Sequence, residues 1–505
     1  MTALMNTTMA RLRDSFSLPG EVRVPGYSRS QTGIGIVHLG IGAFHRAHQA
    51  LYTEEVLENS GGNWAICGVS LRSPKVRDQL APQDGLYTLL ERDGSGDRMR
   101  IIGAVREVLF APESPETVLE RMSTPETRIV SLTVSEKGYC HDPATGKLNT
   151  DHPDVQHDLR HPDCPRGALG FLVEALRLRK ESGLPGFTVL CCDNLPENGR
   201  AVRGLVLEFA EWRDPKLANW IEANATFPCT MVDRIVPATT DADRDSVARS
   251  FGIRDEGVVV GEPFRQWVIE DRFVCGRPVW EKVGAELVED VRPYETMKLR
   301  LLNGTHSTLA YLGYLAGYEH VSDVMERLEF VKLLRAMMAE EIAPTLQMPA
   351  GVELTAYQAA LLVRFSNPAL KHRTWQIAMD GSQKLPQRLL GTIRDRFASG
   401  LAFPRLALAV AGWMRFVVGR DEQGHPLEVC DPLAEQFRQI AEETGMLRDD
   451  VLDTACAEAY VHRLLALRPI FGDDLPAVPE FATAVMTAFQ QLLEAGVSEA
   501  VRRSA

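Results

Sequence analysis

The chain has 505 residues, which is too long for a single hydrophobic core, so we expect at least two domains. Apolar residues make up 45% of the sequence and charged residues 24%, which excludes a disordered or fibrous protein. The formal net charge of −13 argues against nucleic acids and anionic membranes as partners, because phosphate groups require clustered cations. A small anionic metabolite is still compatible with this charge.

The sequence also favours a reduced, cytoplasmic protein. No run approaches the roughly 20 apolar residues of a membrane span, and the first residues lack the basic start and apolar stretch of a secretory signal. The nine cysteines are scattered, odd in number and never spaced as C-x-x-C. We therefore expect buried thiols rather than disulfides.

In the first half of the chain, short apolar runs alternate with helix-like segments, which is typical of a parallel sheet covered by helices. Strands are expected at residues 34–39, 64–71, 127–134 and 187–192, and helices at residues 43–57 and 167–181. One more strand is expected to end at Asp233.

The second half has a different character, because long amphipathic patterns separated by Gly and Pro dominate from residue 294 onward. Examples are residues 295–316 and 323–343. We place the domain boundary near residue 290. The predicted fold class is an α/β domain at residues 1–290 followed by a mostly α-helical domain at residues 291–505.

A glycine turn follows the first predicted strand and opens a helix, in residues 37–48 (VHLGIGAFHRAH). The first glycine permits a tight turn, and the second removes a Cβ where a pyrophosphate would approach the helix N-terminus. His45 replaces the third glycine of G-x-G-x-x-G, so a simple strand–helix junction is the alternative. The residues expected to bind the dinucleotide are Gly40, Gly42, Ala43, Phe44 and Arg46.

The choice between NAD and NADP is less clear from the sequence. An acidic residue about 20 positions after the turn normally receives the ribose hydroxyls, but none occurs between Glu58 and Asp78. Arg72, Lys75 and Arg77 lie there instead. These residues either accept the 2′-phosphate of NADP or form a solvated surface.

The segment 293–312 (PYETMKLRLLNGTHSTLAYL) carries the candidate catalytic groups. At 100° per residue, Glu295, Lys298, Asn303 and His306 share an arc of about 140° on one helix. Leucines surround them, so these polar groups form either a site or a satisfied structural network.

These side chains suit alcohol–ketone interconversion. A lysine in a partly desolvated cleft titrates nearer neutrality and can act as general base or acid on the hydroxyl. Amide N–H donors, here Asn303 and Asn194, can stabilise the reacting oxygen as charge develops. Asn194 and Asp233 are expected at the carboxyl ends of strands, where open α/β sheets bind ligands.

Taken together, the chain resembles the long-chain mannitol dehydrogenase family, which includes the fructuronate (mannonate) reductases. The resemblance runs from about residue 36 to about residue 497. It is carried by residues 40–49 (GIGAFHRAHQ), 131–139 (SLTVSEKGY), 192–198 (CDNLPEN), 227–237 (FPCTMVDRIVP), 262–267 (EPFRQW) and 297–307 (MKLRLLNGTHS).

The resemblance implies a Rossmann-type N-terminal domain, a mostly helical C-terminal domain and a metal-free active site between them. It makes Lys298 the general acid/base, with Asn194 and Asn303 holding the reacting oxygen. It further implies that His306 orients the substrate, that Asp233 belongs to the substrate cleft and that Glu295 gates proton exchange with solvent. NAD is the implied cofactor, with NADP left open, and the protein is implied to be a monomer.

Within this family, residues 365–388 resemble the fructuronate reductases more than the mannitol enzymes. The chemistry agrees, because Arg373 can pair bidentately with a uronate carboxylate and Lys384 adds a second positive charge. The alternative is that Arg373 pairs with a protein carboxylate such as Asp380. The expected substrate is thus a sugar acid, D-fructuronate or D-mannonate, with a neutral polyol as the first alternative and a non-catalytic dinucleotide sensor as the second.

We predict no metal site. The candidate ligands Asp151, His152, His157, His161 and Cys164 lie in a segment interrupted by prolines, and no second ligand pair follows at a zinc spacing.

Overall fold

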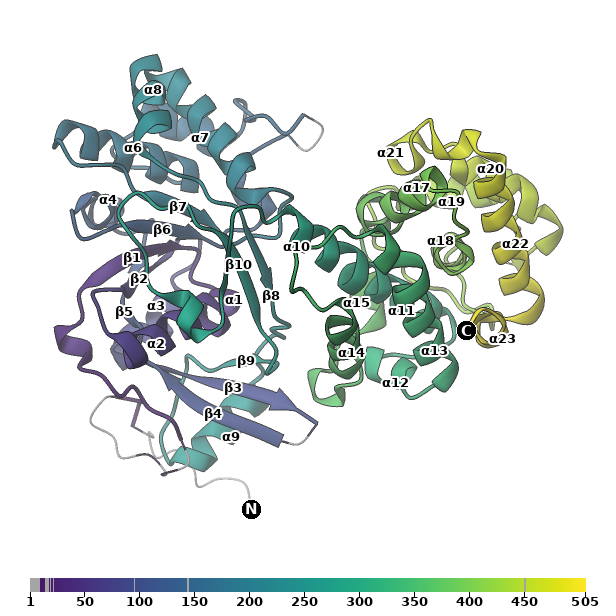
Figure 1. Cartoon of the computed structure of the whole chain (residues 1–505), viewed down its shortest axis with the longest axis horizontal. Helices are drawn as coiled ribbons and strands as arrows, with labels where there is room; N and C mark the ends of the chain where they lie inside the picture. The colour runs from purple at the N-terminus through teal and green to yellow at the C-terminus, as the bar shows by residue number, and fades with distance from the viewer. Residues whose placement is uncertain are drawn as a thin grey trace. The chain divides into compact units, whose positions relative to one another are not determined.

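The computed structural model describes residues 10–13, 18, 20, 22–94, 96–142, 145–448 and 451–505. The chain divides into two compact units, an N-terminal unit (Met1–Arg292) and a C-terminal unit (Pro293–Ala505), coloured purple to teal and teal to yellow in Figure 1. This division falls two residues after the boundary expected at residue 290. The N-terminal unit contains one five-stranded and two three-stranded sheets. The C-terminal unit is mostly helical, as the sequence predicts, with one short pair of strands, β12 (Leu447–Arg448) and β13 (Val451–Leu452).

A five-stranded parallel sheet organises the N-terminal unit. Its order is β5-β2-β1-β6-β7, so the first strand lies at the centre and the chain winds outward in both directions, as in Rossmann folds. The strands are β1 (Ile34–Leu39), β2 (Ala65–Ser70), β5 (Val105–Phe110), β6 (Ile129–Leu132) and β7 (Thr188–Cys191). Four of these strands were predicted, and β5 was not.

Both faces of this sheet are buried, which explains why its strands read as continuous apolar runs. Val37 and Leu39 face one core, whereas Ile36 between them faces the other. The first core is covered by α4 (Pro115–Ser123), α6 (Ala168–Glu181) and α7 (Asn198–Arg213), and the second by α2 (Gln49–Ser60) (Figure 1).

Two three-stranded sheets accompany the parallel sheet, and the sequence indicated only one of their strands. The β3–β4 hairpin is extended by β9, and the strand that ends at Asp233 pairs antiparallel with β10. The predicted strand end at Asp233 is therefore correct, but its strand lies outside the parallel sheet. The strands are β3 (Tyr87–Asp93), β4 (Gly96–Ile102), β8 (Thr230–Asp233), β9 (Val259–Gly261), β10 (Gln266–Glu270) and β11 (Glu286–Val288).

A single helix was predicted over residues 43–57, but the structure has two helices there, separated at His48. Residues Ala43–Ala47 form α1, and α2 begins at Gln49 after an irregular turn at His48 (φ −124°, ψ −86°). The turn places Nε2 of His48 2.9 Å from the carbonyl oxygen of Gln266, a contact 218 positions away in sequence. A long-range bond of this kind overrides local helical periodicity.

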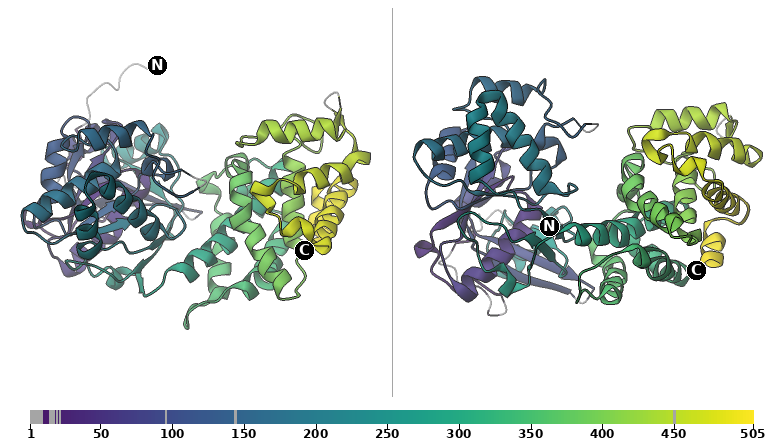
Figure 2. Two further views of the ribbon diagram at one scale, coloured as in Figure 1. Left: turned by 90° about the horizontal axis from the view of Figure 1, so that it is seen from above. Right: turned by 45° about the horizontal axis from the view of Figure 1, so that its top comes forward.

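In the C-terminal unit, α11 (Thr305–Leu315) is buried along nearly its whole length and contacts α15 and α18. The further helices, seen from two directions in Figure 2, are α12 (Val321–Met325), α13 (Leu328–Ala336), α14 (Leu354–Phe365), α15 (Thr374–Ala378), α16 (Gly381–Leu385), α17 (Gly391–Ala398), α18 (Pro404–Phe416), α19 (Ala434–Glu443), α20 (Ala457–Leu465), α21 (Arg468–Phe471), α22 (Pro479–Ala495) and α23 (Val497–Ser504).

The amphipathic patterns at 295–316 and 323–343 are helical, but neither forms a single α-helix. The first consists of α10 (Arg292–Met297), a π-helical segment (Lys298–Gly304) and α11. The second is split into α12, α13 and a π-helical segment (Met337–Ile342). Apolar periodicity predicts where helices lie but does not reveal a change in their winding.

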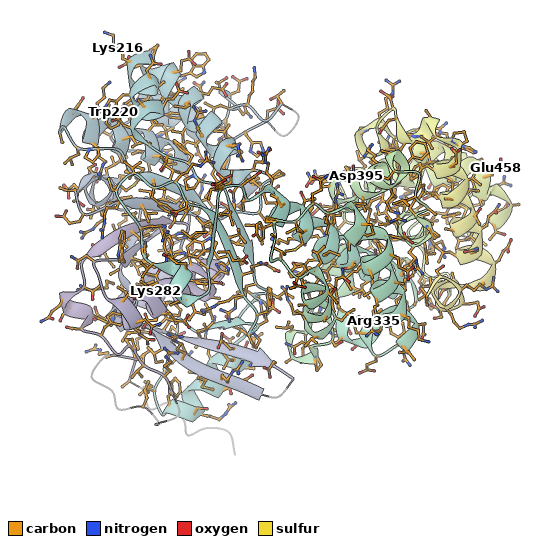
Figure 3. All side chains as sticks on the ribbon, viewed as in Figure 1. Lys216, Trp220, Lys282, Arg335, Asp395 and Glu458 are labelled. Carbon is orange, nitrogen blue, oxygen red and sulfur yellow. The ribbon has the colours of Figure 1, made fainter. Side chains whose placement is uncertain are left out.

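Charged side chains cover the outside of both units, as Lys216, Arg335 and Glu458 illustrate in Figure 3. Within the described part of the chain, every helix is too short or too polar to cross a lipid bilayer.

Candidate active site

The glycine turn borders a cavity of about 260 Å³ in the N-terminal unit, which we name the glycine-turn cavity. The segments that follow β1, β2 and β6 contribute most of its wall, so it lies where ligands bind in doubly wound sheets. Its lining residues are Gly40, Ile41, Gly42, Ser70, Leu71, Arg72, Ser73, Val76, Thr133, Val134, Gly138 and Ala168.

The two glycines of the turn differ in backbone conformation and in the space around their Cα atoms. Gly40 adopts a positive φ of 93°, and a Cβ there would lie 2.2 Å from the carbonyl oxygen of Thr133. Gly42 has an ordinary backbone, and a Cβ there would meet no heavy atom closer than Gly40 O at 3.8 Å. Gly40 is thus required by the fold, whereas Gly42 leaves open space that a pyrophosphate can use. These features fit a dinucleotide.

The other predicted cofactor residues, Ala43, Phe44 and Arg46, are not among the residues that line the glycine-turn cavity. Ala43 and Phe44 open α1. Arg46 is buried, donates to the carbonyl oxygen of Gly257 at 2.6 Å and lies over the ring of Tyr87. Its guanidinium therefore attaches α1 to the neighbouring sheet, and a contact of Arg46 with the dinucleotide stays a prediction.

Of the three basic residues after β2, one lines the glycine-turn cavity and two do not. Arg72 lines the glycine-turn cavity and donates to Oδ2 of Asp154 at 2.5 Å. Arg77 is held by Asp78 and Glu113, outside the cavity lining. Lys75 begins α3 (Lys75–Leu80) and is exposed.

The segment after β7 is fixed by side chains that the sequence reasoning missed. Asp193 accepts hydrogen bonds from the backbone N–H groups of Val134 and Ser135, each at 2.9 Å, and from the Tyr139 hydroxyl at 2.6 Å. Burial raises the pKa of Asp193, although these hydrogen bonds oppose the shift. Asn194 is the next residue and is exposed. The hydrogen bonds of Asp193 therefore fix the backbone beside Asn194.

Asn198 connects the same segment to β8. Its amide nitrogen donates to the carbonyl oxygens of Asp193 (3.0 Å) and Thr230 (2.9 Å), and its Oδ1 accepts from the Thr230 N–H. The pattern C-D-N-L-P-E-N therefore contains two positioning residues around one exposed amide, a distinction that the motif alone does not show.

Asp233 is buried at the end of β8, opposite Gln266 of β10. The next residue, Arg234, is a fully buried anchor. It donates to the carbonyl oxygens of Glu262 and Ala47 and to the carboxylate of Glu91. Arg234 therefore fixes the chain at Asp233 relative to α1.

In the C-terminal unit, Lys298 and Asn303 lie on the π-helical segment and are half-buried, and Glu295 on α10 is half-buried as well. Hydrogen bonds from i to i+5 wind this segment more widely than an α-helix, so the arc computed at 100° per residue does not describe it. Gly304 ends the segment, and a Cβ there would lie 2.7 Å from the carbonyl oxygen of Arg388. Single-turn π segments are frequent at functional sites.

His306, on the first turn of α11, is buried in a cationic environment. Its ring stacks on Phe365 with centroids 5.2 Å apart and meets the ring of His372 edge-on at 4.7 Å. Burial lowers the pKa of His306 well below its ordinary value, and the charges of Arg388, Arg364 and Lys384 lower it further. Burial also lowers the pKa of the neighbouring His372. The His306 imidazole is therefore neutral at pH 7, and its Nε2 is buried without a hydrogen-bond partner among the described residues.

Two of these cations are held beside the same segment. Lys384 Nζ donates to the carbonyl oxygens of Ile377 (3.3 Å) and Met379 (2.5 Å), and burial together with Arg388 lowers its pKa to about 8. Arg388 Nη1 donates to the Ser307 hydroxyl at 3.0 Å. Lys384 was predicted as a site residue, whereas Arg388 was only the last residue of the segment used to choose a substrate.

Arg373 lies in a different setting. Its side chain is 61% exposed, and its Nε is 3.8 Å from a carboxylate oxygen of Glu319. The structure thus shows pairing with a protein carboxylate, as in the sequence-based alternative, but with Glu319 instead of Asp380. The guanidinium groups whose charge acts on His306 are those of Arg364 and Arg388, which the sequence reasoning missed.

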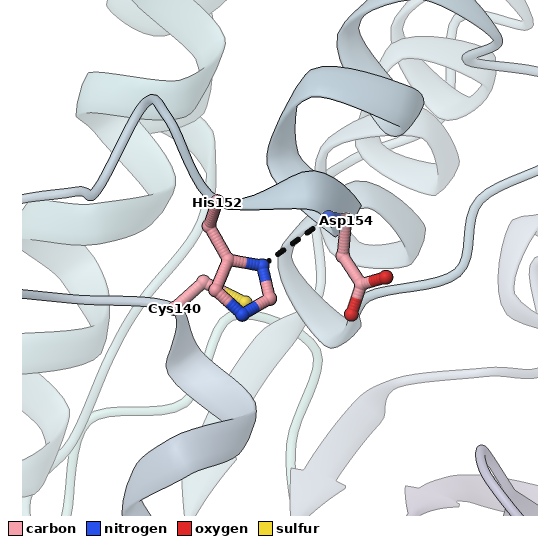
Figure 4. Close-up of side chains that lie close together, drawn as sticks. All are labelled: Cys140, His152 and Asp154. Carbon is pink, nitrogen blue, oxygen red and sulfur yellow. Dashed lines mark hydrogen bonds between the residues drawn. The ribbon is translucent and has the colours of Figure 1, made fainter.

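A cluster of potential metal ligands occurs in the N-terminal unit, where Cys140, His152 and Asp154 have ligand atoms within 4.8 Å of one another (Figure 4). The sequence reasoning grouped His152 with His157, His161 and Cys164 instead. His152 Nδ1 accepts the Asp154 N–H at 3.2 Å, and Asp154 pairs with Arg72. Burial raises the pKa of the Cys140 thiol to about 11. His152 and Asp154 therefore have partners within the fold that explain their positions.

Two family models match the chain. The Rossmann domain of mannitol dehydrogenases matches residues 34–282, and the C-terminal domain of mannitol dehydrogenases matches residues 290–493.

Individual relatives cover nearly the whole chain. D-mannonate oxidoreductase of Escherichia coli is 51% identical, over 94% of this chain and 97% of the relative. An uncharacterized oxidoreductase of the same bacterium, YeiQ, is 50% identical over 96% and 98%. Mannitol 2-dehydrogenase of Pseudomonas fluorescens, solved as a ternary complex with NAD and D-mannitol, is 41% identical with a TM-score of 0.82 over 96% and 97% of the two chains.

Proposed function

Because the chain belongs to the mannitol dehydrogenase family, we propose that it is a nicotinamide-dependent dehydrogenase acting on a sugar acid. The proposed reaction is the reversible reduction of the C5 ketone of D-fructuronate to D-mannonate with NADH. Its support is the 51% identity to a D-mannonate oxidoreductase and the cationic surroundings of His306.

We assign the dinucleotide to the glycine-turn cavity. The Pseudomonas fluorescens relative was solved with NAD, and Gly42 in this chain leaves space where a pyrophosphate would lie. The bound nicotinamide supplies or accepts the hydride. Gly40 holds the turn in its left-handed conformation, and Gly42 permits the close approach of the phosphates.

We assign proton transfer to Lys298. During reduction, its ammonium group gives a proton to the carbonyl oxygen as hydride reaches the carbon, and it takes that proton back during oxidation. Asn194 and Asn303 donate hydrogen bonds to the same oxygen. Glu295 exchanges the proton of Lys298 with solvent, and Asp233 contributes to the substrate cleft.

His306 orients the substrate in this proposal. Its imidazole is neutral at pH 7, and Nε2 is buried without a partner among the described residues. An unsatisfied buried polar atom is costly, so a substrate hydroxyl that hydrogen-bonds to Nε2 relieves this cost on binding.

The observation that carries the choice of a sugar acid is the set of cations around His306. The charges of Arg364, Lys384 and Arg388 all act electrostatically on its ring. The hydrogen-bond acceptors of Lys384 and Arg388 are neutral, namely two backbone carbonyl oxygens and the Ser307 hydroxyl, although the carboxylates of Asp380 and Asp431 also act on Lys384. A uronate carboxylate would give both cations a charge-assisted partner. We therefore propose that Lys384 and Arg388 bind the carboxylate, with the sequence-based choice, Arg373, as the alternative.

A neutral polyol is the second candidate substrate, because the Pseudomonas fluorescens relative was solved with D-mannitol at 41% identity. Two variants separate the candidates. Arg388→Gln should lower kcat/KM for D-fructuronate by about tenfold more than for D-fructose, since a charge-assisted contact is lost. The matched control, Arg373→Gln, should change the two values equally.

The outcomes of this experiment are distinct. A selective loss in Arg373→Gln alone would transfer the carboxylate contact to Arg373. Equal losses for both substrates in both variants would contradict the sugar-acid assignment. Thermal unfolding of Arg388→Gln should accompany the kinetics, because this residue also donates to Ser307.

A further inference from the structure

Arg72 is the charged residue among those that line the glycine-turn cavity. It follows β2 by two positions, and its side chain is 60% exposed. In Rossmann folds, the end of the second strand is where the dinucleotide's adenosine ribose is recognised. Arg72 therefore lies at the position that distinguishes a 2′-hydroxyl from a 2′-phosphate.

The chemistry of this wall does not match the usual arrangement for NAD. An Asp or Glu normally accepts the ribose hydroxyls of NAD, whereas a nearby Arg accommodates the 2′-phosphate of NADP. The lining residues of this cavity include no carboxylate, but they include the hydroxyls of Ser70 and Ser73 beside Arg72. This wall offers hydrogen-bond donors and a positive charge to the ribose.

A carboxylate approaches Arg72 from another part of the unit. Asp154 lies in the first turn of α5 (Pro153–Arg160), and its Oδ2 accepts from Nη2 of Arg72 at 2.5 Å. The Asp154 backbone N–H donates to Nδ1 of His152, which caps α5 (Figure 4). The second bond fixes the backbone of Asp154, and Arg72 retains N–H donors that its bond to the Asp154 carboxylate does not use.

The other two basic residues of the loop, Lys75 and Arg77, lie outside the cavity lining. Arg77 is held by Asp78 and Glu113. A second carboxylate, that of Asp158, also acts on Arg72.

We propose that the glycine-turn cavity binds NADP(H) as well as NAD(H), with the Arg72 guanidinium on the ribose 2′-phosphate and Asp154 weakening this contact by competing for the same guanidinium. The inference rests on the proposed function only in requiring that the cavity bind a dinucleotide. A phosphate dianion competes well with a single carboxylate for a guanidinium fork.

Calorimetric titration of the purified full chain tests the proposal without depending on turnover. The ligands are NADH, NADPH and the fragments 5′-AMP and 2′,5′-ADP. The unaltered chain should bind 2′,5′-ADP more tightly than 5′-AMP. Arg72→Gln should weaken NADPH and 2′,5′-ADP by about tenfold or more and leave NADH within about threefold. Arg77→Gln, an arginine of the same loop outside the cavity lining, should leave all four affinities unchanged.

A second pair of variants tests the role of Asp154. Asp154→Asn removes the competing charge and should strengthen NADPH binding by about threefold to tenfold, with NADH unchanged. Arg72→Lys keeps the positive charge and should retain part of the NADPH affinity. Thermal unfolding of each variant establishes that it is folded before its affinities are compared.

Several results would overturn the inference. They are NADH binding without measurable NADPH binding, equal losses of NADH and NADPH in Arg72→Gln, or no gain of NADPH affinity in a folded Asp154→Asn. Failure of the proposed function gives a different result, because neither dinucleotide would then bind.

Discussion

The glycine turn and the segment around His306 are built on opposite principles. The turn is defined by its backbone, because Gly40 needs a left-handed conformation and Gly42 leaves open the space that we assign to the phosphates. The His306 segment is defined by side chains, which lie on a π-helical turn and on the helix that follows it. In the first region a missing Cβ makes the site, and in the second region particular functional groups make it.

This difference determines how each region responds to substitution. In the glycine turn, a Cβ at Gly40 would collide with Thr133, whereas a Cβ at Gly42 fits the fold and fills only the open space beside the turn. We expect the chemistry of the His306 segment to change with the charge of each neighbour. Substitutions in the two regions should therefore separate binding of the dinucleotide from chemistry.

The largest expected effect is on turnover. Lys298→Ala should lower kcat by about a thousandfold, because general acid/base catalysis typically contributes 10²–10⁴. Dinucleotide affinity, measured by titration, should stay within about twofold. Normal turnover in this variant would show that another group transfers the proton, and activity in the unaltered chain would exclude a non-catalytic sensor.

The two glycines should respond differently to the same change. Gly42→Ala should leave the melting temperature unchanged, because the added Cβ meets no atom closer than 3.8 Å. It should weaken NADH binding by about tenfold or more, because the Cβ would occupy the space that we assign to the phosphates. Gly40→Ala should destabilise the chain by about 1–3 kcal/mol or more, owing to its backbone conformation and its contact with Thr133. A Gly42→Ala chain with normal NADH affinity would remove the dinucleotide from this cavity.

Sequence alone predicted the backbone-defined region better than the environment of the side-chain-defined region. The strand before Gly40 and the glycine spacing are local patterns, and both are found in the structure. The π-helical winding at Lys298 and the charges of Arg364 and Arg388 beside His306 depend on contacts between distant helices. The break at His48 arises in the same way, from a bond to Gln266.

The charge on Lys384 should make substrate recognition depend on pH. Burial lowers its pKa from 10.5 to about 8, so the side chain is charged below pH 8 and becomes neutral as the pH rises through that value. The KM for D-fructuronate should therefore increase by roughly tenfold between pH 7 and pH 9.5, and the KM for D-fructose should change less. Lys384→Met should show a high KM for the sugar acid throughout this range. An unchanged wild-type KM for D-fructuronate would contradict the assignment of Lys384.

The smallest effect at neutral pH concerns the stability of the N-terminal unit. His38 is buried with its ring nitrogens 2.8 Å from the hydroxyls of Ser131 and Thr133, and burial lowers its pKa from 6.5 to about 3. Between pH 6.5 and 3 the unfolded chain therefore binds a proton that the folded chain does not. This difference makes the free energy of unfolding decrease as the pH falls.

His38→Gln should reduce that decrease by about 1.4 kcal/mol per pH unit well inside this range. Urea unfolding at pH 7, 6 and 5 measures the difference between the two chains. Identical slopes for the variant and the unaltered chain would show that His38 is protonated in the folded state.

Steady-state oxidation of NADH by the unaltered chain with D-fructuronate and with D-fructose tests the central claim most directly. The claim is that this chain uses a nicotinamide to reduce a sugar acid whose carboxylate meets the cations around His306. It predicts a kcat/KM at least about tenfold higher for D-fructuronate, the ratio expected from one charge-assisted contact. An equal or higher kcat/KM with D-fructose would contradict it.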